Sequence, residues 1–253
     1  MKVLITFALA NEFAPWRKLR RFERLAAGSS GSAYAAVIGE CEVRVVLTGA
    51  GRFAAQRSLS HAFDGAPELC IASGLCGGLK PAYAPGDVLA ARAAADVAGA
   101  RLIQCDGELV ARAAGAGATI VDKFLVSDRV ISTAAQKRQL GAAGDAVDME
   151  SVFVLAAAWQ RGVRAIAVRA VSDSSDSDLP LDFIRVFSDR GEVSVPRVVG
   201  QLVRSPGRLP GLLKLANESE RAASALAHFL EAYLQQMEAG PWDELARAEA
   251  LAV

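Results

Sequence analysis

Short apolar runs rich in β-branched residues alternate along the chain with alanine-rich stretches. The runs cover residues 3–7, 43–47, 69–72, 88–91, 119–121, 124–126 and 165–171, each of a length typical of a buried strand. Residues 53–63 and 150–160 repeat their apolar positions at helical spacing, and a strand-like stretch at 145–147 precedes the second. This alternation predicts an α/β fold with a mostly parallel sheet covered on both faces.

The pattern changes beyond Pro180. Polar loops are followed by apolar positions at helical spacing near residues 195–203, 209–215 and 218–237, which predicts helices that cap the sheet. Residues 238–253 contain Gly240 and Pro241 and end in mixed small residues, so we expect a loosely held tail. The remaining residues, 1–237, are expected to form one domain.

Composition disfavours several classes of protein. Apolar residues make up 52% of the chain, but no uncharged run approaches the roughly 18 residues that span a bilayer. The first apolar run is too brief for a signal peptide, and the 28 basic and 28 acidic residues leave no overall charge to attract nucleic acid. Four scattered cysteines and two distant histidines form no zinc or disulfide pattern. We therefore expect a soluble, cytoplasmic protein without metal or cofactor, whose acid–base chemistry relies on carboxylates.

Two glycine-rich segments stand where apolar runs end. Residues 48–52 read TGAGR at a strand-to-helix junction, and residues 73–79 read SGLCGGL after the run at 69–72. Glycine allows a ligand to approach backbone N–H groups at such ends, although a structural turn explains the first segment equally well. Neither spacing matches G-x-x-x-x-G-K-[ST] or G-x-G-x-x-G, which disfavours a nucleoside triphosphate site and a Rossmann-type oxidoreductase.

Two further segments carry carboxylates. Asp148 and Glu150 lie at a strand-to-helix junction, where a carboxylate either favours the helix N-terminus or holds the vicinal hydroxyls of a sugar. Ser172 and Asp173 follow the run at 165–171 and begin an acidic, serine-rich loop. A loop aspartate is usually solvated, but open α/β folds also bind ligands at the carboxyl ends of their strands.

Taken in order, these segments resemble the purine nucleoside phosphorylase/uridine phosphorylase superfamily, in particular its methylthioadenosine/S-adenosylhomocysteine nucleosidase branch. The resemblance rests on residues 7–12, 49–51, 73–79, 86–87, 148–150 and 169–173. Each motif is short, but the six occur in the family's order over nearly the whole chain. The resemblance implies a homodimer with a single-domain, three-layer α/β/α phosphorylase-like fold whose central sheet is mixed and partly barrel-like.

The resemblance also implies roles for individual residues. Asp173 matches the general acid that protonates a purine at N7, and Ser172 would orient it. Glu12 matches the carboxylate that activates the attacking water, and Glu150 the one that binds the ribose 2′- and 3′-hydroxyls, with Met149 against the sugar. Carboxylates on two sides of an oxocarbenium-like transition state suit cleavage of an N-glycosidic bond, and we expect burial to favour the protonated form of the acid.

The predicted base site departs from the nucleosidase pattern. Val130 stands where an aromatic ring usually stacks on adenine, so stacking is lost unless Phe153 or Phe183 replaces it. Ile131 would still offer main-chain contacts to the edge of the base. Gly77 completes the base-binding positions that the resemblance implies.

The predicted 5′ pocket departs from the pattern too. Ala50 replaces a larger apolar residue of the relatives and, with Leu9, implies a widened pocket. Residues 178–183 and 205–213 further resemble the hopanoid-associated nucleosidase subgroup, whose members release adenine from adenosylhopane. Packing on the sheet is the commoner role for a helix such as 209–215, and contact with a membrane surface, without stable insertion, is the alternative. The expected partner is a small-molecule adenine nucleoside with a 5′-substituent.

Hydrolysis is distinguished from phosphorolysis by charge. Phosphorolytic members carry an arginine ahead of the glycine motif and a hydroxyl within it, and here Ala72 and Leu75 occupy those positions. An apolar pair cannot neutralise phosphate and Glu12 would repel it, although Arg52 is a candidate ligand. A nucleoside-binding module without catalysis would not require all three predicted carboxylates. We therefore predict a nucleosidase, with a phosphate-dependent phosphorylase as the alternative.

Overall fold

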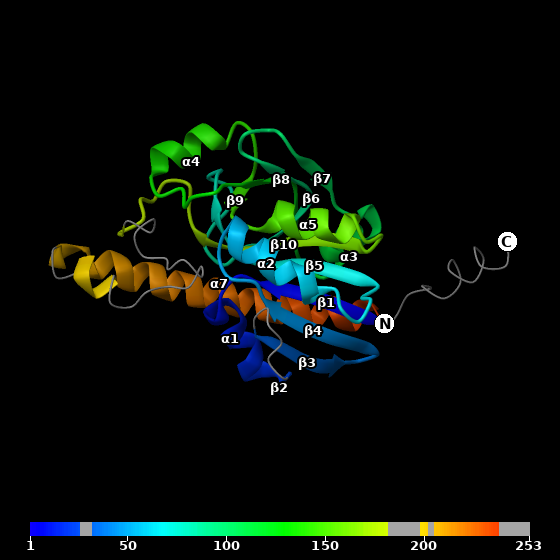
Figure 1. The fold of residues 1–253 in the computed structure, drawn as a ribbon. Coiled ribbons are helices and arrows are strands. Elements are labelled where there is room, and N and C mark those ends of the chain that lie inside the picture. Colours follow the sequence, from blue (N-terminus) through cyan, green and yellow to red (C-terminus); the bar gives the residue numbers. More distant parts are fainter. Residues whose placement is uncertain (26–31, 182–197, 202–204, 238–253) are drawn as a thin grey trace, which may run out of the picture.

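Strands and helices make up most of the described chain (Figure 1). The structure is a computed structural model that describes residues 1–25, 32–181, 198–201 and 205–237. The strands are β1 (Lys2–Phe7), β2 (Glu23–Arg24), β3 (Ala33–Ile38), β4 (Cys41–Leu47), β5 (Leu69–Gly78), β6 (Val88–Asp96), β7 (Leu102–Gln104), β8 (Thr119–Val126), β9 (Ala146–Asp148) and β10 (Arg164–Asp173). The helices are α1 (Ala10–Leu19), α2 (Arg52–Ala62), α3 (Gly107–Gly115), α4 (Ala134–Leu140), α5 (Ser151–Trp159) and α7 (Leu209–Gln236).

The strands form one mixed sheet, part of which closes on itself. Their order is β10-β6-β8-β9-β5-β1-β4-β3-β2, and β10 also pairs with β5. That pairing closes β5, β10, β6, β8 and β9 into a five-strand ring, while β1, β4, β3 and β2 continue as an open sheet. The expected α/β fold with a mixed, partly barrel-like sheet is confirmed. The mostly parallel sheet expected from alternation alone is wrong, because five of the ten pairings in the described chain are antiparallel.

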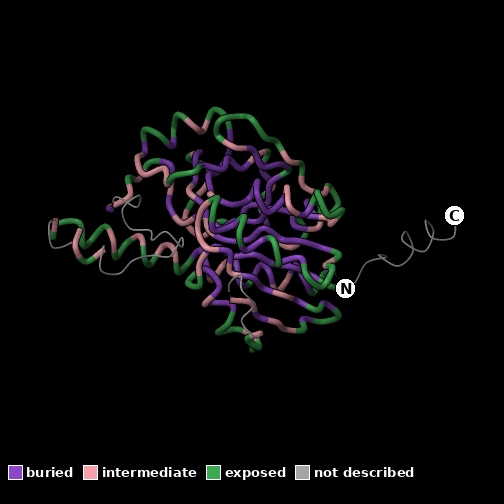
Figure 2. Tube along the Cα trace, viewed as in Figure 1, coloured by how far each residue is buried: buried purple, intermediate pink, exposed green. Residues whose placement is uncertain are grey.

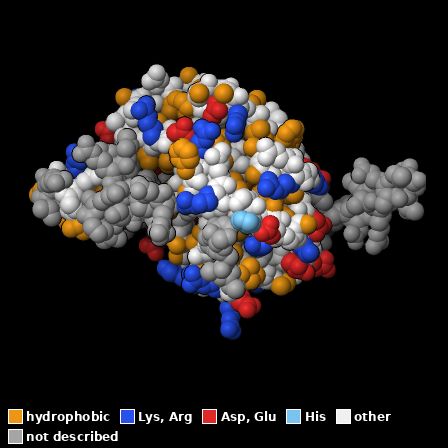
Figure 3. Space-filling view, in the orientation of Figure 1, with side chains coloured by type: hydrophobic (Ala, Val, Ile, Leu, Met, Phe, Trp, Pro, Cys, Tyr) orange, Lys and Arg blue, Asp and Glu red, His pale blue; other side chains and the backbone are white. Residues whose placement is uncertain are grey.

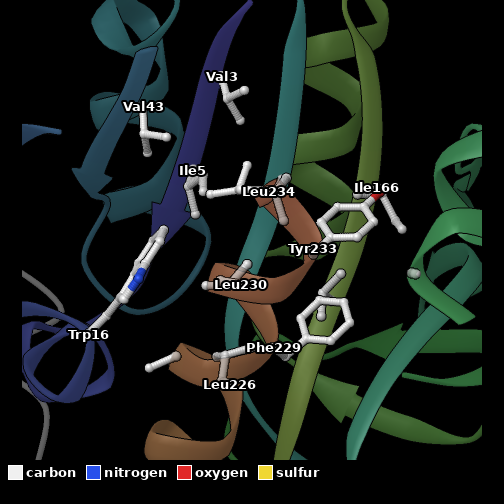
Figure 4. Close-up of a cluster of buried hydrophobic side chains, with 14 of the residues drawn as sticks. Val3, Ile5, Trp16, Val43, Ile166, Leu226, Phe229, Leu230, Tyr233 and Leu234 are labelled. Carbon is white, nitrogen blue, oxygen red and sulfur yellow. The ribbon is translucent and has the colours of Figure 1, made fainter. Parts of the chain in front are cut away.

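Helices cover both faces of the sheet because strand β1 is apolar on both sides. Val3 and Ile5 belong to a buried cluster with Trp16 of α1 and Leu230 of α7 (Figure 4). Leu4, which points the other way, is completely buried in a second cluster with side chains of α2 and α5. Successive side chains of a strand point to opposite faces, so such a strand needs a helix layer on each side. Full burial of one aliphatic side chain of this kind stabilises the fold by roughly 1.5–3 kcal/mol.

Several elements differ in extent from the sequence prediction. The glycine motif was expected to follow a strand, but β5 continues through it because backbone pairing with β10 extends to Gly77. Asp173, expected in a loop, is the last residue of β10. The two runs predicted at 119–121 and 124–126 form the single strand β8. The apolar pattern missed β2, β3, β7, α1, α3 and α4.

The two helices expected at 209–215 and 218–237 form one long helix, α7. Its second half packs on the sheet as expected, but its first turns do not, since Leu209 and Leu213 are 46% and 57% exposed (Figure 2). Among the described residues, no helix is both long and apolar enough to cross a membrane. Of the helix predicted at 195–203, residues 198–201 are helical and the others lie outside the described residues. The tail predicted at 238–253 also lies outside them.

Candidate active site

The three predicted carboxylates lie around the carboxyl half of β5. Glu12 lies in the first turn of α1, just after β1, and Gly51 lies between β4 and α2. Glu150 follows β9, and Asp173 ends β10. Strands β1, β4, β5 and β10 are parallel neighbours, so their carboxyl ends meet at one edge, where α/β folds bind ligands.

Glu12 is buried and bonds to two different elements. Its Oε2 accepts hydrogen bonds from the N–H groups of Ala8 (2.9 Å) and Leu9 (3.0 Å), which forms a capping box at the start of α1. Its Oε1 accepts a third from the N–H of Leu75 on β5, 3.3 Å away, which capping does not explain. Burial raises the pKa of Glu12 despite the opposing charge of Arg169, so this carboxylate is a stronger base than an exposed one.

Arg169 is a buried cation shared by three carboxylates. Its Nε lies 2.8 Å from Asp148 Oδ2, its Nη2 lies 3.7 Å from Glu150 Oε2, and its Nη1 donates to the carbonyl oxygen of Ser73 at 3.1 Å. Burial alone would lower the pKa of Arg169, but the negative charges of Asp148, Glu150 and Glu12 outweigh burial and raise it. The guanidinium therefore stays charged although it is buried.

Gly74 allows Glu12 and Arg169 to approach the same point of β5. It has a φ of +144°, and a Cβ there would overlap Nη1 of Arg169 and lie 3.2 Å from Oε2 of Glu12. A side chain at this position would displace one of the two charged groups. The glycine motif is explained here by close approach of side chains.

The two carboxylates at 148–150 have different partners. Asp148 Oδ1 accepts hydrogen bonds from the N–H groups of Glu150 and Ser151, both at 3.1 Å, and so satisfies the start of α5. Glu150 points across to the β4–α2 loop, where its Oε1 accepts a bond of 2.7 Å from the N–H of Gly51. Burial raises the pKa of Glu150 to about 8, although Arg169 opposes the shift.

Asp173 is buried as expected, but it is not isolated. Ser172 Oγ donates to its Oδ1 at 2.7 Å, and the ammonium of Lys137 forms an ion pair with its Oδ2. A Cβ on Gly77, the neighbouring residue of β5, would lie 3.1 Å from the same Oδ2. Ser172 therefore orients the carboxylate, and a lysine compensates its charge.

Strand β5 connects the two ends of the site. Glu12 lies over Gly74 and Asp173 lies beside Gly77, three residues further along, which corresponds to roughly 10 Å of strand. Cys76, between the two glycines, has its pKa raised well above the usual value by burial, and Asp173 and Glu12 both add to that shift. The carboxylates of Glu12 and Asp173 therefore lie beside the same strand, about three residues apart along it.

The sequence matches a known protein family over most of its length. The model of the phosphorylase superfamily matches residues 2–204, which is most of the chain. The chain belongs to the phosphorylase superfamily. The resemblance that the six motifs indicated is confirmed at this level. No curated protein matches the chain.

Solved structures share the fold of this superfamily member at low sequence identity. A Helicobacter pylori futalosine hydrolase is 17% identical with a TM-score of 0.71, and 93% of this chain covers 98% of that one. A Helicobacter pylori 5′-methylthioadenosine/S-adenosylhomocysteine nucleosidase with butyl-thio-DADMe-Immucillin-A is 18% identical with a TM-score of 0.72, at coverages of 93% and 98%. The corresponding Neisseria meningitidis nucleosidase with methylthio-immucillin-A is 19% identical with a TM-score of 0.69, at coverages of 93% and 99%. These similarities establish the fold.

The positions predicted to bind the sugar and to line the 5′ pocket lie near the carboxylates of Glu12 and Glu150. Met149 approaches the β4–α2 loop, because a Cβ on Gly51 would lie 3.5 Å from its Cε. Ala50 is half-buried in the same loop. Leu9, also half-buried, is the N-cap residue of α1 and donates its N–H to Glu12.

The predicted base-binding positions are less tightly defined. Val130 and Ile131 lie half-buried between β8 and α4, where Ile131 packs against the small cluster that contains Leu79. Phe153 belongs to the core cluster of α2 and α5, with the guanidinium of Arg52 5.7 Å from its ring centroid. Phe183 lies outside the described residues.

Three residues of the site were not assigned roles from sequence. Arg169 carried a signal, since it is a charged residue inside an apolar strand, and Asp148 was left between two interpretations. Lys137 carried none, because one lysine among polar residues of a short helix resembles a solvated residue. Its burial follows from the contact of α4 with the loop after β10.

A cavity of about 1050 Å³ lies in another part of the protein. Its lining includes Lys2, Arg21, Arg44 and Pro67, so it opens near the amino end of β1. None of the four buried carboxylates of the site lines it. On the face shown in Figure 3, acidic and basic side chains lie interspersed.

The raised pKa of Glu150 predicts a pH-dependent stability. Because the folded protein holds this proton more tightly than the unfolded chain, the stabilisation is complete below the usual pKa of 4.5 and is lost as the pH rises through about 8. We expect the free energy of unfolding of the wild type to fall over this range relative to Glu150→Gln, by on the order of a few kcal/mol. Denaturant unfolding of both proteins at about pH 5.5 and 8.5 measures the difference.

The exposed Glu220→Gln serves as the control for this comparison, and it should follow the wild type at both pH values. Parallel pH dependences of the wild type and Glu150→Gln would contradict the assignment of a raised pKa.

Proposed function

We propose that this protein hydrolyses the N-glycosidic bond of a 5′-substituted adenine nucleoside and releases the free base. Glu12 activates the attacking water, Glu150 binds the ribose hydroxyls, and Asp173 protonates the departing base. A buried carboxylate with a raised pKa is suited to accept a proton near neutral pH, which supports the role of Glu12. Cleavage through an oxocarbenium-like transition state uses such groups on two sides of the anomeric carbon.

One observation carries the choice of hydrolysis, namely that Glu12 occupies the backbone N–H of Leu75 in the glycine motif. A phosphate dianion placed against this part of β5 would meet a carboxylate. The adjacent cation does not offset the repulsion, because Arg169 is already engaged by Asp148 and Glu150. Arg52, the remaining candidate phosphate ligand, is exposed and lies over the ring of Phe153.

The site and the solved relatives support the proposed substrate class. Structures with the same fold include a nucleosidase with 5′-methylthioadenosine in its active site, and the futalosine hydrolase acts on a different nucleoside. Ala50, a small residue in the β4–α2 loop, leaves room for a 5′-substituent. We propose a bulky substituent, and a lipid-linked adenosine is one candidate.

The test is an assay of base release from adenosine, methylthioadenosine, S-adenosylhomocysteine, inosine and a lipid-linked adenosine, each with and without phosphate. We expect adenine release at equal rates in both conditions, with free ribose sugar as the second product. Strict dependence on phosphate, with a ribose 1-phosphate product, would establish the phosphorylase alternative. Tight nucleoside binding without release of base would leave a binding module.

A further inference from the structure

Lys137 is a completely buried cation that the proposed chemistry does not use. It lies in the last turn of α4 with 0% of its surface exposed. Its Nζ donates hydrogen bonds to the carbonyl oxygens of Ser174 (2.8 Å) and Ser177 (2.9 Å) and forms the ion pair with Asp173 Oδ2. All three ammonium protons therefore have acceptors on the segment that carries the acid.

The helix of Lys137 is tied to this segment at its other end as well. The N–H of Ala134, at the start of α4, donates to Asp178 Oδ1 at 2.7 Å, and the N–H of Leu179 donates to the carbonyl oxygen of Ser132 at 2.8 Å. The predicted base-binding residues Val130 and Ile131 directly precede this helix. Lys137 thus joins the wall of the base site to the acid.

We propose that Lys137 is a positioning residue that acts through Asp173 in protonation of the departing base. Its ammonium fixes Oδ2, while Ser172 fixes Oδ1, so the carboxyl group is held from both sides. An ion pair closed to solvent is also expensive to build unless its geometry is well satisfied, which marks it as more than a surface contact.

The proton balance is complete within the site. When the bond between C1′ and N9 breaks, its electron pair goes to the purine, and N7 takes the proton of the Asp173 carboxyl group, which is left as a carboxylate paired with the ammonium of Lys137. The attacking water forms a bond to C1′ and gives a proton to Glu12. The pair loses one proton and Glu12 gains one, so the site keeps its total charge. This inference rests on the proposed nucleosidase activity.

The test compares leaving groups that need protonation with one that does not. We expect Lys137→Met to lower kcat for adenine release about 100-fold, at the lower end of the effect of a general acid, with little change in KM. Release of 4-nitrophenolate from the corresponding riboside should change by less than about threefold, since this anion leaves without a proton. Lys80→Met, which breaks the 2.5 Å ion pair with Asp145 outside the site, is the matched control and should slow neither reaction selectively.

A double-mutant cycle provides a second, independent measurement. If Lys137 acts through Asp173, then Lys137→Met should not slow adenine release further in an Asp173→Asn background. Lys137→Gln, which keeps a donor for the carbonyls of Ser174 and Ser177, replaces the methionine variant if that protein does not fold. The cycle tests whether Lys137 acts through Asp173 even if the 4-nitrophenyl riboside is a poor substrate.

Equal slowing of both leaving groups, additive effects in the cycle, or wild-type rates for Lys137→Met would each overturn the inference. Failure of the wild type to release base from any nucleoside is a separate result, which overturns the proposed function and this inference with it.

Discussion

Asp173→Asn is expected to lower the rate of adenine release by about 10³-fold, within the range of 10²–10⁴ that a general acid contributes. An amide cannot give N7 a proton, and the purine then has to leave as an anion. Steady-state rates of base release with the best substrate of the panel measure the effect. Asp176→Asn is the matched control, because this carboxylate lies three residues on and is exposed, and it should keep the wild-type rate.

The same substitution should also lower stability, which the sequence alone did not suggest. Asparagine leaves the ammonium of Lys137 buried without its counter-ion, and breaking a buried pair from one side costs roughly 3–5 kcal/mol. Rates should therefore be compared at a temperature where thermal unfolding shows both proteins to be folded. A folded Asp173→Asn protein with near-normal turnover would remove Asp173 from the mechanism.

Glu12→Gln is expected to slow hydrolysis by about 10²–10⁴-fold, because a neutral amide cannot accept the proton of the attacking water. The change is well matched to the fold, since glutamine at this helix position also supports a capping box with Ala8 and Leu9. Single-turnover rates and the circular dichroism spectrum together separate lost chemistry from lost structure. The exposed Glu23→Gln serves as the control.

Unchanged hydrolysis by a folded Glu12→Gln protein would show that another group activates the water. Restored turnover on addition of phosphate would point instead to phosphorolysis, because loss of the negative charge would open the N–H of Leu75 to an anion.

Local patterns predicted the parts of the fold that depend on one strand or helix at a time. The apolar runs located β1, β4, β5 and β10, and helical spacing located α2 and α5 to within one residue at each end. Such patterns could not predict the closure of the five-strand ring, because it depends on β10 pairing with β5 along one edge and with β6 along the other. It was the family resemblance that supplied the barrel-like sheet, and the structure confirms it.

For the site too, short sequence motifs predicted some residues, while those that depend on long-range contacts were not predicted. Glu12, Glu150 and Asp173 were predicted as site residues because six short motifs kept their order, and the structure places all three around the carboxyl half of β5. The partners of these carboxylates, Arg169 and Lys137, were not predicted. Their burial and their ion pairs depend on contacts between segments far apart in the sequence. The substrate, the homodimer and the cytoplasmic location stay predictions.

The shared position of Arg169 has a consequence for altering this protein by design. One guanidinium faces the carboxylates of Asp148, Glu150 and Glu12, so the proposed sugar recognition and the proposed water activation depend on the same positive charge. At a pH above about 8, where Glu150 is ionised, replacing it with a neutral residue to relax the sugar preference would strengthen the attraction of Arg169 for Glu12 and make that carboxylate a weaker base. Specificity and rate are therefore expected to change together, and variants that separate them need compensating substitutions around this one cation.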